Sequence, residues 1–367
     1  MQFEISREAL IKPLQLVAGV VERRQTLPVL SNVLLVLEDG QLSLTGTDLE
    51  VELIGRVAVE GGGTAGEVTV PARKLMDICK SLPDNASLKF AQEDDKIVIR
   101  SGRSRFLLST LPPSDFPSVE ESSGTLEFSV AQKTLKDMLD STSFAMAQQD
   151  VRYYLNGMLF EVSADYLRLV ATDGHRLAMH TEALKLPAAE LTQVIVPRKG
   201  IQELARLLDD EDASVNVVIG TNHIQAKTDN FTFTSKLVDG KFPDYDRVLP
   251  KGGDKTIVAA RQDLRHALSR TAILSNEKYR GIRLLLSNDE LKILANNPEQ
   301  EEAEELVSIQ YKGEALEIGF NVSYLIDVLT VISSPEVKII VSDPNSSALI
   351  EPSEENGSLY VVMPMRL

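Results

Sequence analysis

Residues able to perform acid–base or metal chemistry are sparse in this chain of 367 residues. The four histidines, His175, His180, His223 and His266, have no metal-ligand spacing with the only cysteine, Cys79. The first of them lies in the sequence TDGHR, which holds an acid and a base, but no nucleophile can be assigned beside them. As structure alone, the Asp-Gly pair predicts a turn between strands. We therefore expect no catalytic residue, no metal and no cofactor.

Motifs that bind phosphates or activate a serine are also missing from the sequence. It contains no G-x-S-x-G, no Walker loop and no G-x-G-x-x-G. The run 61–63 of three glycines lies between expected strands and does not open a helix, so it predicts a turn and not a phosphate cradle. We interpret the chain as a protein that holds macromolecules, not as an enzyme.

The composition is that of an ordinary globular protein, with 43% hydrophobic and 25% charged residues. The chain exceeds the roughly 250–300 residues at which one hydrophobic core stops growing, so two or three domains are expected. A single cysteine excludes an internal disulfide framework and suits a reducing compartment. No apolar run approaches the roughly 18–20 residues of a membrane span, and the start MQFEISREAL does not resemble a secretory signal. We expect a cytoplasmic protein that does not bind membranes.

The elements that must position any binding residue recur three times along the chain. A short strand leads into an amphipathic helix in each copy, and Leu10, Leu135 and Leu264 hold the same place in the three helices. A second helix recurs in step, and Pro71 and Pro197 are expected at its first helical position, where proline is favoured. Alternating strands fill the intervals between the helices.

The repeat predicts an α+β fold of three tandem copies of one unit. Polar, glycine-containing stretches separate the copies, as linkers between domains do. The expected domains are 1–124, 125–253 and 254–367.

Charge is distributed unevenly over these elements. The formal net charge is −16, which at first argues against nucleic acid. The six expected helices nevertheless carry +7 together, which leaves −23 for the rest of the chain. A basic lining beside an acidic exterior attracts a polyanion to one surface. The alternative is that Lys and Arg are common in helices because they are good helix formers. No base-reading motif is present, so any nucleic-acid contact should be to the backbone.

Two further charged segments indicate self-association. Arg100, Arg103 and Arg105 surround an apolar strand in the first copy, and the third copy has the acidic run 299–305. A basic edge and an acidic edge on one chain favour head-to-tail contact, which closes into a ring if the rotation permits. A solvated acidic loop is the alternative.

The last ten residues, SLYVVMPMRL, read as an apolar strand followed by two methionines beside a proline. Flexible methionine side chains form adaptable apolar surfaces that bind several partners. The alternative, a last strand that docks on the core, explains Leu359–Val362 better than the residues after them.

Together these features resemble the bacterial sliding clamp, the β subunit of DNA polymerase III, over the whole chain. The most specific stretches are LPVLSNVLL, TDLEVEL, VPARKLMDI, FAMAQQDVRYYLNG, ATDGHRLAM, VPRKG, LVDGKFPDY, ILSNEKYRG, NNPEQEEAEE and VVMPMRL. The resemblance implies a non-catalytic, head-to-tail homodimer: a ring with helices lining its inside and antiparallel sheets outside, which encircles duplex DNA without reading its sequence. Its implied partners are a second copy of itself, the replicative polymerase α subunit, the clamp loader, and other polymerases and repair proteins that carry the clamp-binding motif.

The resemblance also implies three sets of site residues. The DNA-contacting positions match Arg24, Arg73, Gln149, Tyr153 and Tyr154, although the two tyrosines fit either DNA or the peptide pocket. A peptide pocket between the second and third domains matches Leu155, Thr172, Gly174, His175, Arg176, Leu177, Pro243, Arg247, Val248, Asn321, Tyr324, Ser347, Val361, Met363, Pro364, Met365 and Arg366. The dimer interface matches Lys74, Arg103, Arg105, Phe106, Leu108, Ile273, Leu274, Glu299, Glu301, Glu302 and Glu305.

One departure from the family pattern is visible, because Leu306 follows the acidic run where close relatives often continue with acid. It places the detailed list of interface ion pairs in doubt. The rival interpretation is a monomeric repeat scaffold that binds peptides without encircling DNA.

Overall fold

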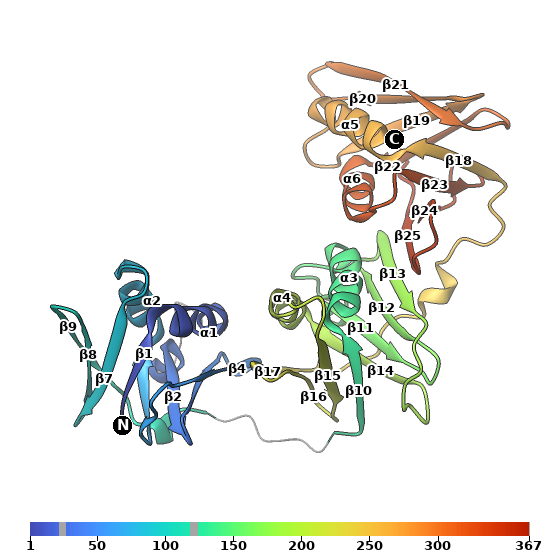
Figure 1. The fold of residues 1–367 in the computed structure, drawn as a ribbon. Coiled ribbons are helices and arrows are strands. Elements are labelled where there is room, and N and C mark those ends of the chain that lie inside the picture. The colour runs from blue at the N-terminus through green and yellow to red at the C-terminus, as the bar shows by residue number, and fades with distance from the viewer. Residues whose placement is uncertain (22–26, 118–123, 367) are drawn as a thin grey trace. The chain divides into compact units, whose positions relative to one another are not determined.

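The computed structural model describes residues 1–21, 27–117 and 124–366. These residues form two compact units, one of Met1–Leu135 with Lys199–Leu237 and one of Lys136–Arg198 with Val238–Leu367. The division passes through the middle copy of the repeat, whose strands are shared between two large sheets. Each unit is described by itself below (Figure 1).

The helices follow the predicted order, two in each copy of the repeat. Their bounds are α1 Arg7–Val20, α2 Ala72–Ser81, α3 Gln132–Thr142, α4 Arg198–Leu207, α5 Arg261–Thr271 and α6 Val322–Val331. Pro71 and Pro197 end the preceding strands and do not occupy the first helical position, so that prediction was wrong by one residue. Both prolines still pair with a neighbouring strand, which holds them in extended backbone.

The first unit contains two antiparallel sheets. A five-stranded sheet has the order β5-β1-β7-β8-β9 and an eight-stranded sheet the order β10-β15-β16-β17-β4-β3-β2-β6. The strands are β1 Gln2–Ser6, β2 Asn32–Glu38, β3 Gln41–Thr47, β4 Val51–Ala58, β5 Gly63–Thr64, β6 Gly66–Pro71, β7 Ser87–Glu93, β8 Lys96–Ser101, β9 Ser104–Ser109, β10 Leu126–Ala131, β15 Ser214–Ile219, β16 His223–Lys227 and β17 Phe231–Lys236. Pairing of β4 with β17 makes one sheet from two copies of the repeat.

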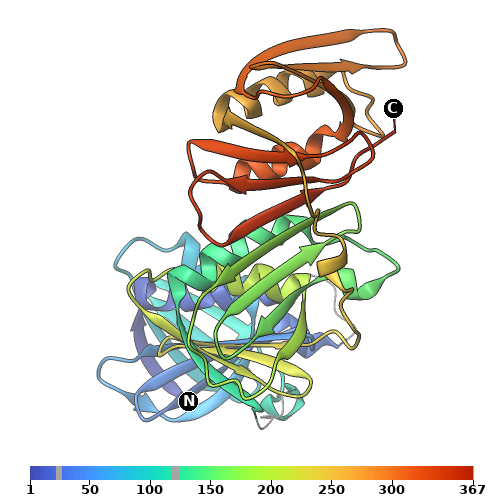
Figure 2. The same ribbon diagram turned by 90° about the vertical axis from the view of Figure 1, so that its right-hand side faces the viewer.

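The second unit contains one sheet of twelve strands, in the order β14-β11-β12-β13-β25-β24-β23-β18-β21-β20-β19-β22. The strands are β11 Gly157–Val162, β12 Leu167–Thr172, β13 Arg176–Glu182, β14 Thr192–Pro197, β18 Lys255–Ala260, β19 Gly281–Ser287, β20 Glu290–Asn296, β21 Glu302–Gln310, β22 Leu316–Asn321, β23 Glu336–Val341, β24 Ala348–Pro352 and β25 Ser358–Val362. Pairing of β13 with β25 again joins two copies. Helices α5 and α6 lie side by side against the strands of the third copy (Figure 2).

Close packing of helix on strand explains the local sequence of the first copy. Helix α1 begins after Ser6, whose hydroxyl accepts a hydrogen bond from the Ala9 amide at 3.2 Å. The helix rests on β3 and β4, where a Cβ atom at Gly46 would lie 2.7 Å from Val17 Cγ1 and one at Gly55 would lie 3.0 Å from Pro13 Cβ. Only glycine allows the helix to approach this closely.

Each unit also has a strand edge with unused pairing capacity among the described residues. Strand β9 ends the five-stranded sheet and pairs with β8 alone. Strand β21 pairs with β20 over residues 302–308 and reaches β18 only at residues 309 and 310. An open edge is a template for pairing with another chain.

Candidate functional site

A tight turn between β12 and β13 forms the centre of the candidate site in the second unit. Gly174 has a φ of +88°, a conformation that glycine adopts without strain. The carboxylate of Asp173 accepts hydrogen bonds from the amides of His175 at 2.9 Å and Arg176 at 3.0 Å. Thr172 donates its hydroxyl to the Arg176 carbonyl at 2.6 Å. The TDGHR sequence is therefore a rigid turn, as predicted, and not a set of free acid and base groups.

The C-terminal residues lie directly beside this turn. The amide of Met363 donates to the His175 carbonyl at 2.9 Å, and the amide of Met365 donates to the Gly319 carbonyl at 2.8 Å. The tail thus continues the pairing of β25 with β13, here called the β13–β25 seam, and then bonds to Gly319 of β22. The Met363 side chain remains 46% exposed, although its backbone is fixed.

A cluster of buried apolar side chains lies beside the turn. Leu177 of β13 and Val361 of β25 are paired across the seam and belong to one buried cluster with Phe242 and Tyr245. The side chain of Tyr154 packs against this cluster and is half-buried. Tyr154 therefore lies against the buried cluster, and its role in DNA contact or in the pocket stays a prediction.

Arg176 connects the turn to the third copy of the repeat. Its guanidinium donates to the Asp173 carboxylate at 3.1 Å and to the Phe144 carbonyl at 3.0 Å, and it forms an ion pair with Asp327 of α6. The same group lies 4.5 Å from the centre of the Tyr324 ring. These contacts border a cavity of about 320 Å³. A planar guanidinium that stacks and forms several bonds at once is held in one orientation.

A second charged pair lies beside the turn, and its carboxylate, Asp150, lines this cavity. The Arg152 guanidinium donates to the Asp150 carboxylate at 2.9 and 3.0 Å, and these bonds lower the pKa of Asp150 to about 2. Arg152 also donates to the Asp173 carbonyl at 3.1 Å. Asp150, Arg152 and Asp327 were missed by the sequence reasoning, because no spacing along the chain relates them to the turn.

The remaining predicted pocket residues belong to the same unit. Leu155 is buried, Asn321 caps α6 through a bond from the Ser323 amide at 2.9 Å, and Val248 is 52% exposed. Arg247 forms an ion pair with Asp244 at 2.7 Å. Pro243 is exposed, Ser347, Pro364 and Met365 are half-buried, and Arg366 is exposed.

Three of the predicted DNA positions are exposed, and the fourth that the structure describes, Tyr154, is half-buried. Arg73 is exposed on α2, Gln149 is exposed with a φ of +53°, and Tyr153 is 57% exposed. The rings of Tyr153 and Tyr154 meet edge to face at 5.8 Å between centroids. Arg24 lies outside the described residues.

Except for Lys74 on α2, the predicted interface residues lie in or next to the two open strand edges or in the turn after α5. On the edge of the first unit, Arg103 and Arg105 are exposed, Phe106 is half-buried and Leu108 is 8% exposed, and Lys74 is exposed on α2. In the second unit, Ile273 is 75% exposed and Leu274 is half-buried. Of the acidic residues, Glu299, Glu301 and Glu302 are exposed, whereas Glu305 bonds Arg270 of α5 at 2.6 and 2.9 Å.

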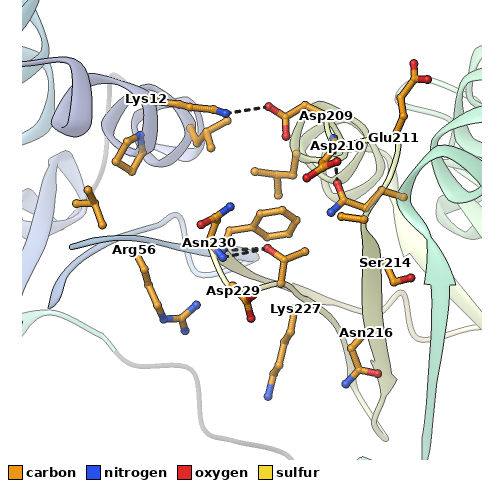
Figure 3. Close-up of a pocket in the computed structure, with 18 of the residues that line it drawn as sticks. Lys12, Arg56, Asp209, Asp210, Glu211, Ser214, Asn216, Lys227, Asp229 and Asn230 are labelled. Atoms are coloured by element: carbon orange, nitrogen blue, oxygen red, sulfur yellow. Dashed lines mark hydrogen bonds and ion pairs between the residues drawn. The ribbon is translucent and has the colours of Figure 1, made fainter.

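The first unit has a separate hollow of about 940 Å³ that the sequence did not indicate (Figure 3). It lies where β4 ends and β17 begins, and an ion pair of 3.3 Å joins Lys12 of α1 to Asp209 across it. Acidic and basic side chains both line it, among them Arg56, Lys227 and Asp229. This mixture of charges selects no ligand.

Among the described residues, two features of other classes of protein are missing. Within the ranges given above, no group of three or more His, Cys, Asp or Glu side chains could hold a metal ion. No helix among the described residues is both long enough and apolar enough to cross a membrane.

Tandem α+β repeats whose antiparallel sheets continue from one copy into the next define the DNA-clamp class. Three models of the DNA polymerase III beta subunit match the chain: the N-terminal domain over residues 1–120, the central domain over 129–244 and the C-terminal domain over 246–366. The chain belongs to this family, the bacterial β sliding clamps, and its function is that of a DNA polymerase sliding clamp.

Relatives and solved structures agree over the full length. The β sliding clamp of Pseudomonas aeruginosa is 67% identical and that of Escherichia coli K12 is 53% identical, each with 100% of both chains covered. The crystal structure of a P. aeruginosa DnaN sliding clamp bound to griselimycin has a TM-score of 0.98 at 67% identity and full coverage of both chains. A Bartonella birtlesii clamp bound to the same compound has a TM-score of 0.96 at 39% identity, again with full coverage. The predicted family and the three-copy fold are confirmed.

Proposed function

We propose that two copies of this chain close head to tail into a ring around duplex DNA and tether the replicative polymerase to it. The open edges support this proposal, because β9 begins directly after Arg103 and carries Arg105, whereas β21 begins within the acidic run 299–305. Pairing of the two edges would use backbone N–H and C=O groups that are otherwise open to hydrogen bonding with other proteins. Ile273 and Leu274 would supply the apolar centre opposite Phe106 and Leu108.

The observation that carries the peptide-binding part is the hydrogen-bonded tail beside the TDGHR turn. It fixes Met363, whose side chain is 46% exposed, two residues after Val361 of the buried apolar cluster, and Arg176 lines a cavity at the same turn. Apolar anchors of a short partner segment fit such a surface. We infer that the polymerase α subunit, the clamp loader, and other polymerases and repair proteins with the clamp-binding motif compete for this pocket.

The DNA contact is sequence-independent in this proposal. A tether that slides cannot use base-specific hydrogen bonds, since these would hold it at particular sites. Arg24, Arg73, Gln149 and Tyr153 would instead touch the phosphate backbone, in part through water. The chain acts as a non-catalytic, cytoplasmic subunit of three domains, with boundaries near residues 124 and 253.

Retention on circular DNA tests the encirclement. Protein loaded by a clamp loader on nicked circular DNA should remain bound in high salt and dissociate after the circle is linearised, because topology and not affinity holds it. Equal loss from the circle and from the linear product would contradict a closed ring. Light scattering gives an independent check, since a monomer of about 40 kDa at micromolar concentration would favour the rival scaffold.

A further inference from the structure

One face of the sheet in the second unit carries a polar row next to an apolar row. Glu161 of β11 pairs with Gln193 of β14 and with Arg168 of β12, which in turn pairs with Thr181 of β13. The apolar row lies two residues away from the polar row on each of the same four strands. It consists of Leu159, Ile195, Val170 and Met179. Because side chains alternate along a strand, both rows point to the same side.

Tyr245 lies over both rows. Its ring belongs to the buried cluster formed by the apolar row, and the residue is 6% exposed. Its hydroxyl lies 2.9 and 3.1 Å from the two carboxylate oxygens of Glu161 and accepts a bond from the Arg168 guanidinium at 2.8 Å. Burial raises the pKa of Tyr245 to about 12, so the hydroxyl keeps its proton for Glu161.

The carboxylate that holds Tyr245 is itself fixed from several sides. Glu161 is 3% exposed and receives bonds from Gln193 at 2.6 Å, from the Tyr166 hydroxyl at 2.9 Å and from Arg168 at 3.2 Å. Arg168 also donates to Thr181 at 2.8 Å. A buried network whose members are all bonded defines one position for each of them.

The segment that contains Tyr245 has few other attachments. The Val238 amide, just before the segment, donates a hydrogen bond to the Ile195 carbonyl at 2.9 Å. Within residues 239–253, one backbone–backbone hydrogen bond lies outside the helices and strands, from the Val248 amide to the Tyr245 carbonyl at 3.0 Å. Its position on the sheet therefore depends on side chains: Phe242 and Tyr245 belong to the buried cluster, and Leu249 packs against it. Pro243, Arg247 and Val248, which the proposed pocket requires, are exposed on the same segment.

We propose that Tyr245, bonded to Glu161 and Arg168, is a positioning residue that fixes this wall of the peptide pocket. The proposal rests on the proposed function of the pocket. A wall that is already ordered in the free protein lowers the entropy that a peptide loses on binding. Loss of the Tyr245 hydroxyl should loosen the wall and weaken peptide binding without changing any residue that touches the peptide.

The test compares Tyr245→Phe with Tyr166→Phe. Each substitution removes one phenol donor to Glu161, but only the first lies on the segment of the wall. The probe is a fluorescein-labelled peptide that copies the clamp-binding segment of the polymerase α subunit, read by anisotropy. We expect Tyr245→Phe to raise the Kd about three- to tenfold, the range of one net hydrogen bond, and Tyr166→Phe to change it less than twofold.

Hydrogen exchange gives a second readout that a general loss of stability would not reproduce. The Val248 amide, which donates to the Tyr245 carbonyl, should exchange faster in Tyr245→Phe than in Tyr166→Phe, while the amides of α5 stay unchanged. Equal Kd values for wild type and Tyr245→Phe, or equal weakening by both substitutions, would overturn the positioning role. Failure of the wild-type protein to bind the peptide would instead reject the proposed pocket itself.

Discussion

The imidazole Nδ1 of His180 lies 3.0 Å from the hydroxyl of Ser358, its partner across the β13–β25 seam. The same nitrogen lies 2.9 Å from the Ser141 hydroxyl of α3, and Nε2 lies 3.3 Å from the Glu182 carboxylate. One buried ring thus connects two strands and a helix from two copies of the repeat. Burial lowers the pKa of His180, against the opposing effect of Glu182 and Asp137.

Stability should therefore fall as the pH is lowered. The imidazole has its ordinary pKa of about 6.5 in the unfolded chain and a lower pKa in the folded protein. The contribution of neutral His180 to the free energy of unfolding is therefore present above the unfolded pKa and is lost as the pH falls through the folded pKa. We expect His180→Gln to show a smaller fall in Tm between pH 7.5 and pH 5.5 than wild type does. Exposed His266→Gln is the control and should follow wild type. Parallel Tm curves for wild type and His180→Gln would contradict the linkage.

Replacing Ile273 and Leu274 with alanine should yield monomers. Ile273 is 75% exposed in the single chain, as expected for an interface centre. Each truncation of a buried aliphatic side chain costs about 2–5 kcal/mol, so the pair should weaken the dimer by at least about a thousandfold. Sedimentation at micromolar concentration measures this. A variant that remains fully dimeric would show that the interface has been placed wrongly.

Deletion of residues 363–367 should abolish peptide binding and leave the dimer intact. The deletion removes the amide bonds to His175 and Gly319 together with the exposed methionine surface beside the turn. Titration with a polymerase-derived peptide and light scattering of the same sample separate the two effects. Unchanged peptide affinity would count against the pocket assignment.

Arg73→Ala should weaken binding to duplex DNA equally for all sequences. Removal of one cation that neutralises a phosphate reduces the slope of log K against log salt by about 1. The slope can be measured with short labelled duplexes between 50 and 200 mM salt. Lys185→Ala is the matched control, because Lys185 is 89% exposed but lies outside the helices. An equal change in the control would show that only the total charge matters.

The amino-acid sequence determined the repeat and the positions of its helices and strands, because periodic apolar residues must face a core in every copy. It also predicted the turn at Asp173-Gly174 and the strand at Leu359–Val362, since both depend on local backbone preferences. The two prolines were placed one residue too far into the helices. Their fixed φ suits the end of a strand as well as the start of a helix.

Only the tertiary structure decided how the copies are joined and what fixes the pocket. The β4–β17 and β13–β25 seams pair strands that are about 180 residues apart, and no local preference encodes such a pairing. Bonds of Glu161 to Tyr245, of Arg176 to Asp327 and of His180 to Ser358 likewise join residues between 84 and 178 positions apart. Each of these polar groups looks like an ordinary surface residue in the sequence. Burial by a distant segment is what makes its partner necessary.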